Sequence, residues 1–177
     1  MKNVVLIGFM GSGKSTVGIR LSYRLRCIVE DTDKLIEKKE GMKIKEMFAQ
    51  KGEPYFRAQE TECLRRLLKQ RERKIIATGG GLPMNRENHP LLKKLGCVVY
   101  LKISPEDVWN RLKKDTTRPL LQCEDPYGRI CELLKERGPL YEEAADMVIE
   151  VGTKNMEQVL NEIVDGLAKR DEAEGQK

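Results

Sequence analysis

The sequence is poor in aromatic residues and has no long apolar run. Of its 177 residues, 5% are aromatic, 40% are hydrophobic and 34% are charged. No apolar stretch approaches the ~18–20 residues that a membrane-spanning helix needs. The stretch at residues 4–10 is too short, and too interrupted by glycine, for the hydrophobic region of a secretion signal. We therefore expect a cytoplasmic protein with no membrane partner.

The cysteines form no recognisable pair. Their number is odd and no C-x-x-C spacing occurs, which argues against a disulfide framework and against a zinc site. We expect reduced thiols, as is usual in the cytoplasm, and core positions for Cys27 and Cys97, which lie in apolar surroundings. The five are Cys27, Cys63, Cys97, Cys123 and Cys131.

The charge excess is small and scattered. Lys and Arg number 33 against 28 Asp and Glu, a net charge of +5. No basic run interleaved with aromatic residues occurs, so we expect no nucleic-acid partner. Surplus arginines can instead bind small anionic molecules. The single histidine, His89, is expected at the surface edge of a helix.

Short β-branched runs alternate with longer amphipathic segments, which predicts an α/β domain with a parallel sheet and helices on both faces. Expected strands cover residues 3–7, 27–30, 74–77, 97–101 and 147–150. Expected helices cover residues 14–26, 32–40, 44–50, 53–71, 86–94, 105–114, 128–145 and 156–169. We expect one domain over residues 1–170, a lid at about 112–126 and a frayed polar tail at 171–177.

The segment after the first expected strand is a complete phosphate-binding loop. Gly8-x-x-x-x-Gly13-Lys14-Ser15 stands between a strand and a helix, the context that the motif requires. Backbone N–H groups of the loop and the positive helix end attract phosphate oxygens. Lys14 would reach the β- and γ-phosphates of ATP, and the Ser15 hydroxyl would bind Mg²⁺, with Thr16 as a second hydroxyl. Gly11 and Ser12 complete the predicted ATP-binding loop.

The acids that could assist follow the second expected strand. The third expected strand ends in glycines and lacks the acid of a typical water-activating NTPase. Asp31 could hold Mg²⁺ through a water, and Asp33 could face an acceptor hydroxyl, because parallel strands end at one edge. In the alternative interpretation, Asp31 or Thr32 is only a helix cap.

Three further features are expected at that same edge. They are Arg57 early in a helix, the triplet Gly79, Gly80 and Gly81, and Arg137. Arg137 stands in a Gly-Pro segment that is expected to interrupt the helix over residues 128–145. Each has a simpler interpretation. Arg57 could pair with Glu60 on a helix surface, the triplet could be only a turn, and Arg137 could be a solvated helix end.

Taken together and in this order, the motifs resemble the shikimate kinase family over residues 4 to about 155. The resemblance rests on GFMGSGKSTVG from residue 8, DTD at 31–33, FR at 56–57, GGG at 79–81, TTRPLL at 116–121 and RGPLY at 137–141. It implies a fold like that of nucleoside monophosphate kinases, with a five-stranded parallel sheet and a mobile lid. It also implies transfer of phosphate from ATP to the 3-hydroxyl of shikimate, towards chorismate and the aromatic amino acids.

The resemblance also implies roles for single residues. Arg57 and Arg137 match the arginines that hold the substrate carboxylate, and Asp33 matches the residue that binds ring hydroxyls and is the candidate base. Gly79, Gly80 and Gly81 match the lining of the acceptor pocket. Arg118 matches the lid arginine that reaches the phosphates, Arg111 the arginine beside adenine, and Lys154 falls in a loosely matching adenine loop.

Two alternatives stay open on the sequence. The first is another small-molecule kinase, for example one acting on gluconate or a nucleotide. The second is an ATP-binding regulator without turnover, against which the set Lys14, Asp33 and Arg118 argues, because a pure binder needs neither a base nor a lid cation. We expect a monomer whose ligands are ATP, Mg²⁺ and shikimate.

Overall fold

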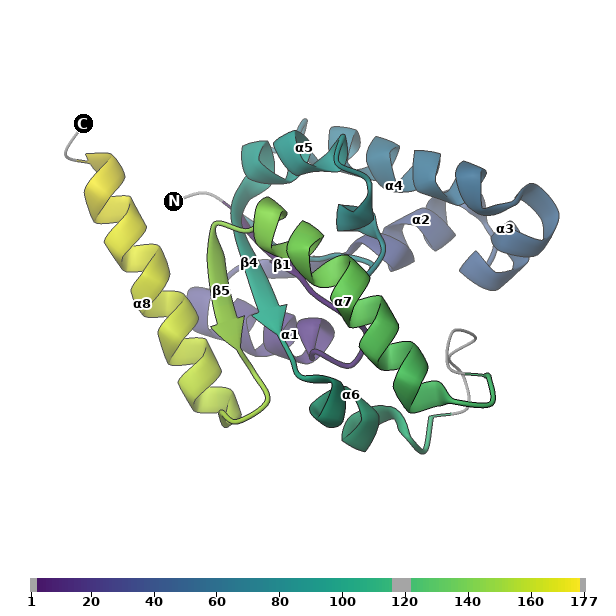
Figure 1. The fold of residues 1–177 in the computed structure, drawn as a ribbon. Helices are drawn as coiled ribbons and strands as arrows, with labels where there is room; N and C mark the ends of the chain where they lie inside the picture. Colours follow the sequence, from purple (N-terminus) through teal and green to yellow (C-terminus); the bar gives the residue numbers. More distant parts are fainter. Residues whose placement is uncertain (1–2, 116–121, 176–177) are drawn as a thin grey trace.

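The computed structural model describes residues 3–115 and 122–175. Its centre is a five-stranded sheet in the order β2-β3-β1-β4-β5, with every pair parallel (Figure 1). The strands are β1 (Asn3–Ile7), β2 (Ile28–Asp31), β3 (Lys74–Ala77), β4 (Gly96–Lys102) and β5 (Met147–Glu150). The expected α/β fold with a parallel sheet is confirmed.

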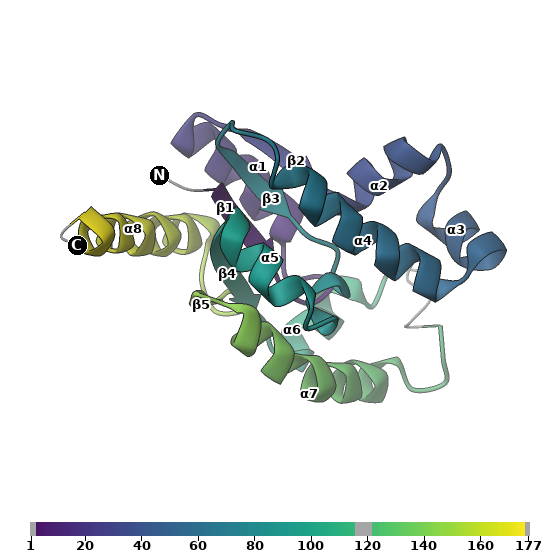
Figure 2. The same cartoon turned by 90° about the horizontal axis from the view of Figure 1, so that it is seen from above.

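Helices cover both faces of the sheet. In the view from above, α5 crosses over β1 and β4 with α4 beside it (Figure 2), and α7 also contacts β4. On the opposite face α1 packs on β2 and β3, and α8 packs on β5. The helices are α1 (Lys14–Leu25), α2 (Thr32–Glu40), α3 (Ile44–Lys51), α4 (Glu53–Leu67), α5 (Asn88–Leu95), α6 (Pro105–Leu112), α7 (Pro126–Ala144) and α8 (Met156–Gly175).

The central strand β1 is covered on both sides. Val4, Val5, Leu6 and Ile7 are all fully buried, as expected for a near-continuous apolar run inside a parallel sheet. From β1 the chain crosses towards the β2 edge of the sheet, whereas from β3 it crosses back past β1 to β4, towards the β5 edge. In open parallel sheets, such a reversal leaves a crevice outside the carboxyl ends of the strands, where ligands bind. The functional site is therefore expected beyond the ends of β1 and β3.

Several expected boundaries need correction. Helix α8 continues to Gly175, so the tail that was expected to fray from residue 171 is largely helical. Its added residues include Glu172 and Ala173, which are good helix formers. Helix α4 ends at Leu67 and not at residue 71, and a short 3₁₀ helix, η1 (Leu82–Met84), was not predicted.

The predicted interruption of the helix that carries Arg137 is wrong. Helix α7 runs unbroken from Pro126 to Ala144, with Pro139 inside it. A proline removes one helical N–H and crowds the residue before it. Here that residue is Gly138, which has no Cβ to collide with the proline ring. The Gly-Pro pair therefore fits within a helix.

The expected burial of two cysteines and the expected exposure of the histidine can now be checked. Cys97 is buried in β4 as expected, whereas Cys27 is half-buried just before β2. His89 is only 6% exposed, so its predicted surface position is wrong.

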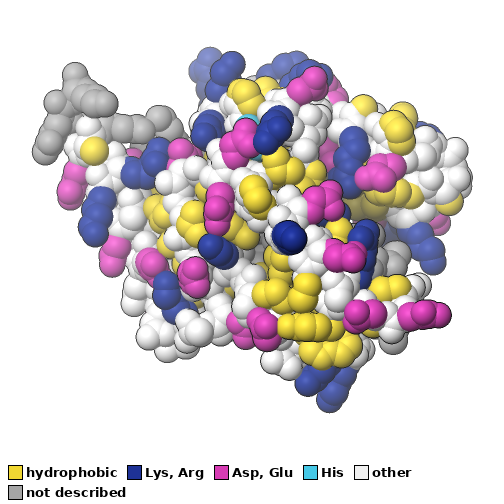
Figure 3. All heavy atoms as spheres, viewed as in Figure 1, with side chains coloured by type: hydrophobic (Ala, Val, Ile, Leu, Met, Phe, Trp, Pro, Cys, Tyr) yellow, Lys and Arg dark blue, Asp and Glu magenta, His cyan; other side chains and the backbone are white. Residues whose placement is uncertain are grey.

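The surface carries both signs of charge. On the face seen in Figure 3, Lys and Arg side chains are interspersed with Asp and Glu around a hydrophobic patch between α6 and α7. Among the helices of the described ranges, none combines the length and the apolar character that crossing a bilayer requires.

Candidate active site

A cleft of about 650 Å³ lies at the carboxyl edge of the sheet. Segments from three strand ends line it: the loop after β1, the start of α2 after β2 and the turn after β3. The lining includes Gly11, Gly13, Lys14, Ser15, Thr16, Asp31, Asp33, Gly79, Gly80 and Arg111, all of which the sequence had singled out.

The loop after β1 is shaped to present backbone N–H groups. Gly11 and Gly13 have φ of 76° and 92°, a conformation that side chains disfavour. At the start of α1, within the described chain, no side chain caps the helix, so the first-turn N–H groups remain available to bind an anion. The Lys14 ammonium donates to the carbonyls of Gly8 and Phe9 at 2.8 and 2.9 Å, so it arches back over the loop.

Ser12 has a different place from its neighbours in the loop. It is 1% exposed, and its Oγ has no hydrogen-bond partner among the described residues. A Cβ on Gly8 would lie 2.9 Å from this oxygen. Ser12 therefore packs under the loop, and only its backbone can serve a phosphate. Ser15 and Thr16 are exposed and line the cleft.

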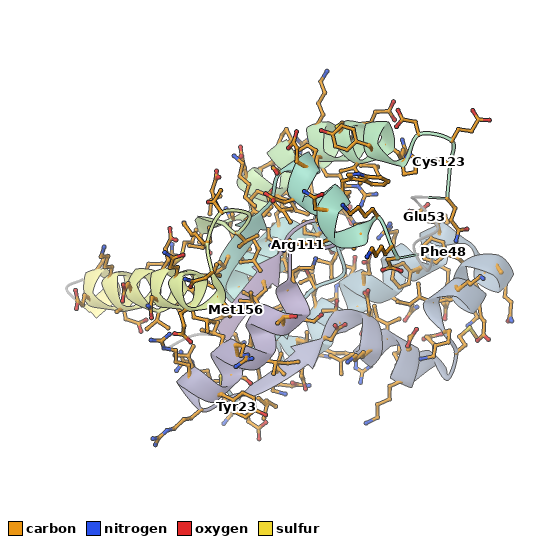
Figure 4. All side chains as sticks on the ribbon, turned by 90° about the horizontal axis from the view of Figure 1, so that it is seen from below. Tyr23, Phe48, Glu53, Arg111, Cys123 and Met156 are labelled. Carbon is orange, nitrogen blue, oxygen red and sulfur yellow. The ribbon has the colours of Figure 1, made fainter. Side chains whose placement is uncertain are left out.

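Arg111 joins the phosphate-binding loop to the segment that follows β5. Its Nη1 donates to the carbonyl of Gly11 at 2.8 Å, and its Nη2 donates to that of Val151, just after β5, at 3.3 Å. Figure 4 shows Arg111 where α6 approaches the start of α1. Lys154 instead forms an ion pair with Glu162 of α8 and does not line the cleft. Arg118 lies outside the described residues.

The two acids at the start of α2 have distinct positions. Asp31 Oδ1 accepts from the backbone N–H groups of Asp33 and Lys34 at 3.0 and 3.3 Å, so the interpretation of Asp31 as a helix cap is correct. Asp31 also lines the cleft. Asp33 Oδ1 is buried and has no hydrogen-bond partner among the described residues. Burial, with the charge of Asp31, raises the pKa of Asp33 to about 6, against the opposing charges of Lys14 and Arg57.

Glu60 is a site residue that the sequence interpretation missed. It was considered only as a surface partner of Arg57, yet it is 1% exposed. Its Oε2 accepts from Arg57 Nη1 at 2.8 Å, and its Oε1 has no partner among the described residues. Burial raises the pKa of Glu60 to about 7; Arg57 opposes this, and Asp33 adds to it. The three-residue spacing indicated the pair, but nothing local to it indicated burial.

Two glycines of the triplet, Gly79 and Gly81, lie in close contact with charged side chains, so the triplet is more than a turn. A Cβ on Gly79 would lie 2.5 Å from Asp33 Oδ1 and 3.2 Å from Glu60 Oε1. A Cβ on Gly81 would overlap the guanidinium of Arg57. Side chains at either position would displace the charged groups around the turn.

Arg57 and Arg137 approach this turn from different helices. Arg57 is held by Glu53 at 2.9 Å on one side and by Glu60 on the other. The Arg137 guanidinium lies 6.0 Å from the ring centre of Phe9. The charges of both arginines act on the buried phenol of Tyr141, whose pKa burial nevertheless raises.

Tyr141 links α7, the helix that also carries Arg137, to the glycine turn. Its hydroxyl donates to the carbonyl of Gly80 at 2.6 Å. Tyr141 stood in the RGPLY motif without an assigned role, since the sequence could not show where its hydroxyl points. Arg137, whose charge acts on Tyr141, is thus close to the glycine turn and is not an isolated helix end.

The donor set of the cleft suits Mg²⁺. Among residues 3–115 and 122–175, no cluster of three or more His, Cys, Asp or Glu could hold a metal. Mg²⁺ needs no such cage, because it keeps several waters and binds one or two protein oxygens together with phosphates. The hydroxyl of Ser15 and the carboxyl groups of Asp31 and Asp33 supply hard oxygens along the cleft.

A phosphate-binding loop, a crevice at the β1–β3 reversal and facing acids and arginines define a P-loop kinase. The shikimate kinase family model matches residues 10–168, and the chain belongs to the shikimate kinase family. It is 46% identical to a shikimate kinase of Sulfurihydrogenibium sp., covering 96% of this chain and 100% of that one. For a shikimate kinase of Burkholderia lata, identity is 44%, with 92% and 88% covered.

Solved structures agree with this placement. A shikimate kinase from Acinetobacter baumannii in complex with shikimate superposes with a TM-score of 0.88 at 38% identity, covering 96% of this chain and 94% of that one. A gluconokinase from Sinorhizobium meliloti reaches a TM-score of 0.60 at 18% identity, covering 97% and 94% of the chains. The second likeness concerns the fold alone.

Replacing Glu60 by Gln should change how stability depends on pH. The folded-state pKa of Glu60, about 7, lies above its ordinary value of 4.5, so between these values the folded state binds more protons than the unfolded state. Stability contributed by this group therefore falls as pH rises through that window. We expect urea unfolding to show that the free energy of unfolding falls between pH 5 and pH 7.5 by less in Glu60→Gln than in wild type. The difference between the two proteins should be about 1–2 kcal/mol.

Glu62→Gln is the matched control, because Glu62 lies on the same helix with its side chain 43% exposed. It should keep the wild-type pH dependence. An identical pH dependence in Glu60→Gln and wild type would contradict a buried, proton-binding Glu60.

Proposed function

We propose that this protein transfers the γ-phosphoryl group of ATP to the 3-hydroxyl of shikimate, which yields ADP and shikimate 3-phosphate. The observation that carries the proposal is the meeting of Asp33, Arg57 and Tyr141 around the glycine turn, beside the phosphate-binding loop. Family membership supports the same reaction. The product would serve the pathway to chorismate and the aromatic amino acids.

The acceptor side of the cleft suits a small acid that carries hydroxyl groups. Arginine binds a carboxylate through two parallel hydrogen bonds, and two arginines approach the turn here. Glu53 and Glu60 hold Arg57 in place, which reduces the entropy that binding would cost. Asp33, whose Oδ1 has no protein partner among the described residues, can accept a hydrogen bond from a substrate hydroxyl.

Transfer of a phosphoryl group depends mainly on alignment and on neutralising charge. In this proposal the loop N–H groups and Lys14 hold the β- and γ-phosphates, and Asp33 orients the 3-hydroxyl. With a pKa of about 6, Asp33 is mostly ionised at neutral pH and can accept the proton of the hydroxyl as transfer proceeds.

Ser15 would bind Mg²⁺ directly, and Asp31 would bind it through a water. The ion would supply positive charge to the β- and γ-phosphate oxygens. Arg118 of the lid would add charge to the transferring group, and lid closure would exclude water. Arg111 would lie beside the adenine, on the side opposite the acceptor.

Coupled measurement of ADP release tests the reaction. With ATP and Mg²⁺, we expect release that requires shikimate and falls to background without it, because the acceptor hydroxyl replaces water as the nucleophile. Gluconate and nucleoside monophosphates serve as comparison acceptors. Release that is independent of shikimate, or faster with gluconate, would contradict the proposal while leaving the phosphate-binding loop intact.

Arg57→Ala should raise the KM for shikimate by about 10–100-fold, since a charge-assisted hydrogen bond is worth about 1.5–3 kcal/mol. The KM for ATP should change little. Arg57→Lys keeps the charge without the planar fork and should fall in between. Arg65→Ala, an exposed arginine on the same helix, is the control. A wild-type shikimate KM in Arg57→Ala would exclude the carboxylate role.

A further inference from the structure

Four side chains from neighbouring elements bond to the turn after β3 or to the start of η1, which follows it. Thr32 Oγ1 accepts from the N–H of Gly79 at 3.0 Å, and the Tyr141 hydroxyl donates to Gly80. Immediately beyond, Asn88 and His89 bond to the two residues that open η1. Asn88 Nδ2 donates to the Leu82 carbonyl at 3.0 Å, and His89 Nε2 lies 2.7 Å from the Pro83 carbonyl.

Asn88 also forms a hydrogen bond with helix α4. It is fully buried, and its Oδ1 accepts from the Thr61 hydroxyl at 2.8 Å. Thr61 lies one helical turn after Arg57 and next to Glu60 on α4. A single side-chain amide therefore bridges the helix that carries Arg57 and the segment that continues from Gly81.

Helix α4 and the glycine turn after β3 lie very close together. The guanidinium of Arg57 lies so close to Gly81 that a Cβ there would overlap it, and Glu60 Oε1 would lie 3.2 Å from a Cβ on Gly79. A shift of α4 against the turn would therefore move Arg57 relative to the backbone that faces the acceptor. Misplacement of a binding group by about 1 Å can cost on the order of 100-fold in rate.

We propose that Asn88 is a positioning residue for the acceptor side. It sets the distance between Arg57 and the glycine turn by bonding at once to Thr61 and to Leu82. This inference rests on the proposed function, because it assigns Arg57 to the shikimate carboxylate. Asn88 itself touches neither substrate nor phosphate; it acts through α4.

Asn3 provides a matched comparison at the opposite edge of the sheet. Its Nδ2 donates to the Leu95 carbonyl at 2.9 Å, and its Oδ1 accepts from the N–H of Lys74 at 2.9 Å. It therefore makes the same kind of bridge, between the end of α5 and the start of β3. Removing it should affect stability and leave the acceptor side unchanged.

The test measures the KM for shikimate, the KM for ATP and kcat in five proteins: wild type, Asn88→Ala, Thr61→Val, Thr61→Ser and Asn3→Ala. Thr61→Val removes the hydroxyl at nearly constant volume, and Thr61→Ser keeps it. We expect Asn88→Ala and Thr61→Val to raise the KM for shikimate at least tenfold, with the KM for ATP within about twofold of wild type. Thr61→Ser should recover most of the wild-type value.

The outcomes separate the two proposals. Absence of shikimate-dependent ADP release in wild type would overturn the proposed function and this inference with it. With wild type active, an unchanged shikimate KM in folded Thr61→Val would overturn the positioning role alone. An equal rise of the shikimate KM in Asn3→Ala would do the same, because the effect would then follow stability. If Asn88→Ala fails to fold, the Thr61 pair decides.

Discussion

Two buried carboxyl groups, Asp33 and Glu60, face the same glycine at the end of β3, and the surrounding site is arranged around their charge. Carboxylates buried without enough hydrogen bonds raise the free energy of the folded state. Each has one oxygen without a partner among the described residues, and both have raised pKa values. Arg57 lies against Glu60, and Lys14 acts on Asp33 from the phosphate side. The arrangement is costly for folding but suited to receiving a ligand with hydroxyl groups.

The same constraint explains the glycine turn. Only residues without a Cβ allow the carboxyl groups and the Arg57 guanidinium to approach the backbone so closely. Because the glycines have no side chains with which to fix the turn, its position depends on hydrogen bonds from neighbouring elements. Among them are those from Tyr141 on α7 and Asn88 on α5. In the proposed function, precision at the acceptor side would come from buried polar side chains that lie behind the turn.

The sequence predicted the parts of this molecule that depend on short-range patterns. The phosphate-binding loop and the start of α2 could be read because their residue types and spacing are set by local backbone geometry. Glu60, Tyr141 and Asn88 could not be assigned, because their roles depend on burial and on contacts with residues distant in the chain.

Two errors have the same origin. A Gly-Pro pair is typical of a helix break, yet α7 continues, because Gly138 leaves room for the ring of Pro139 and buried residues hold the turns on both sides of the pair. His89 stands in a polar stretch, yet it is buried against Pro83. In both cases, surroundings that no local pattern records decided the outcome.

In the proposed reaction, the two arginines at the glycine turn recognise the carboxylate of the acceptor. The most direct measurement compares shikimate with its methyl ester, which keeps every ring hydroxyl and loses the negative charge. We predict that kcat/KM for the ester is lower by at least about 100-fold, because the two half-buried arginines would be left without their partner. Equal use of the ester and the acid would contradict recognition of the carboxylate by Arg57 and Arg137.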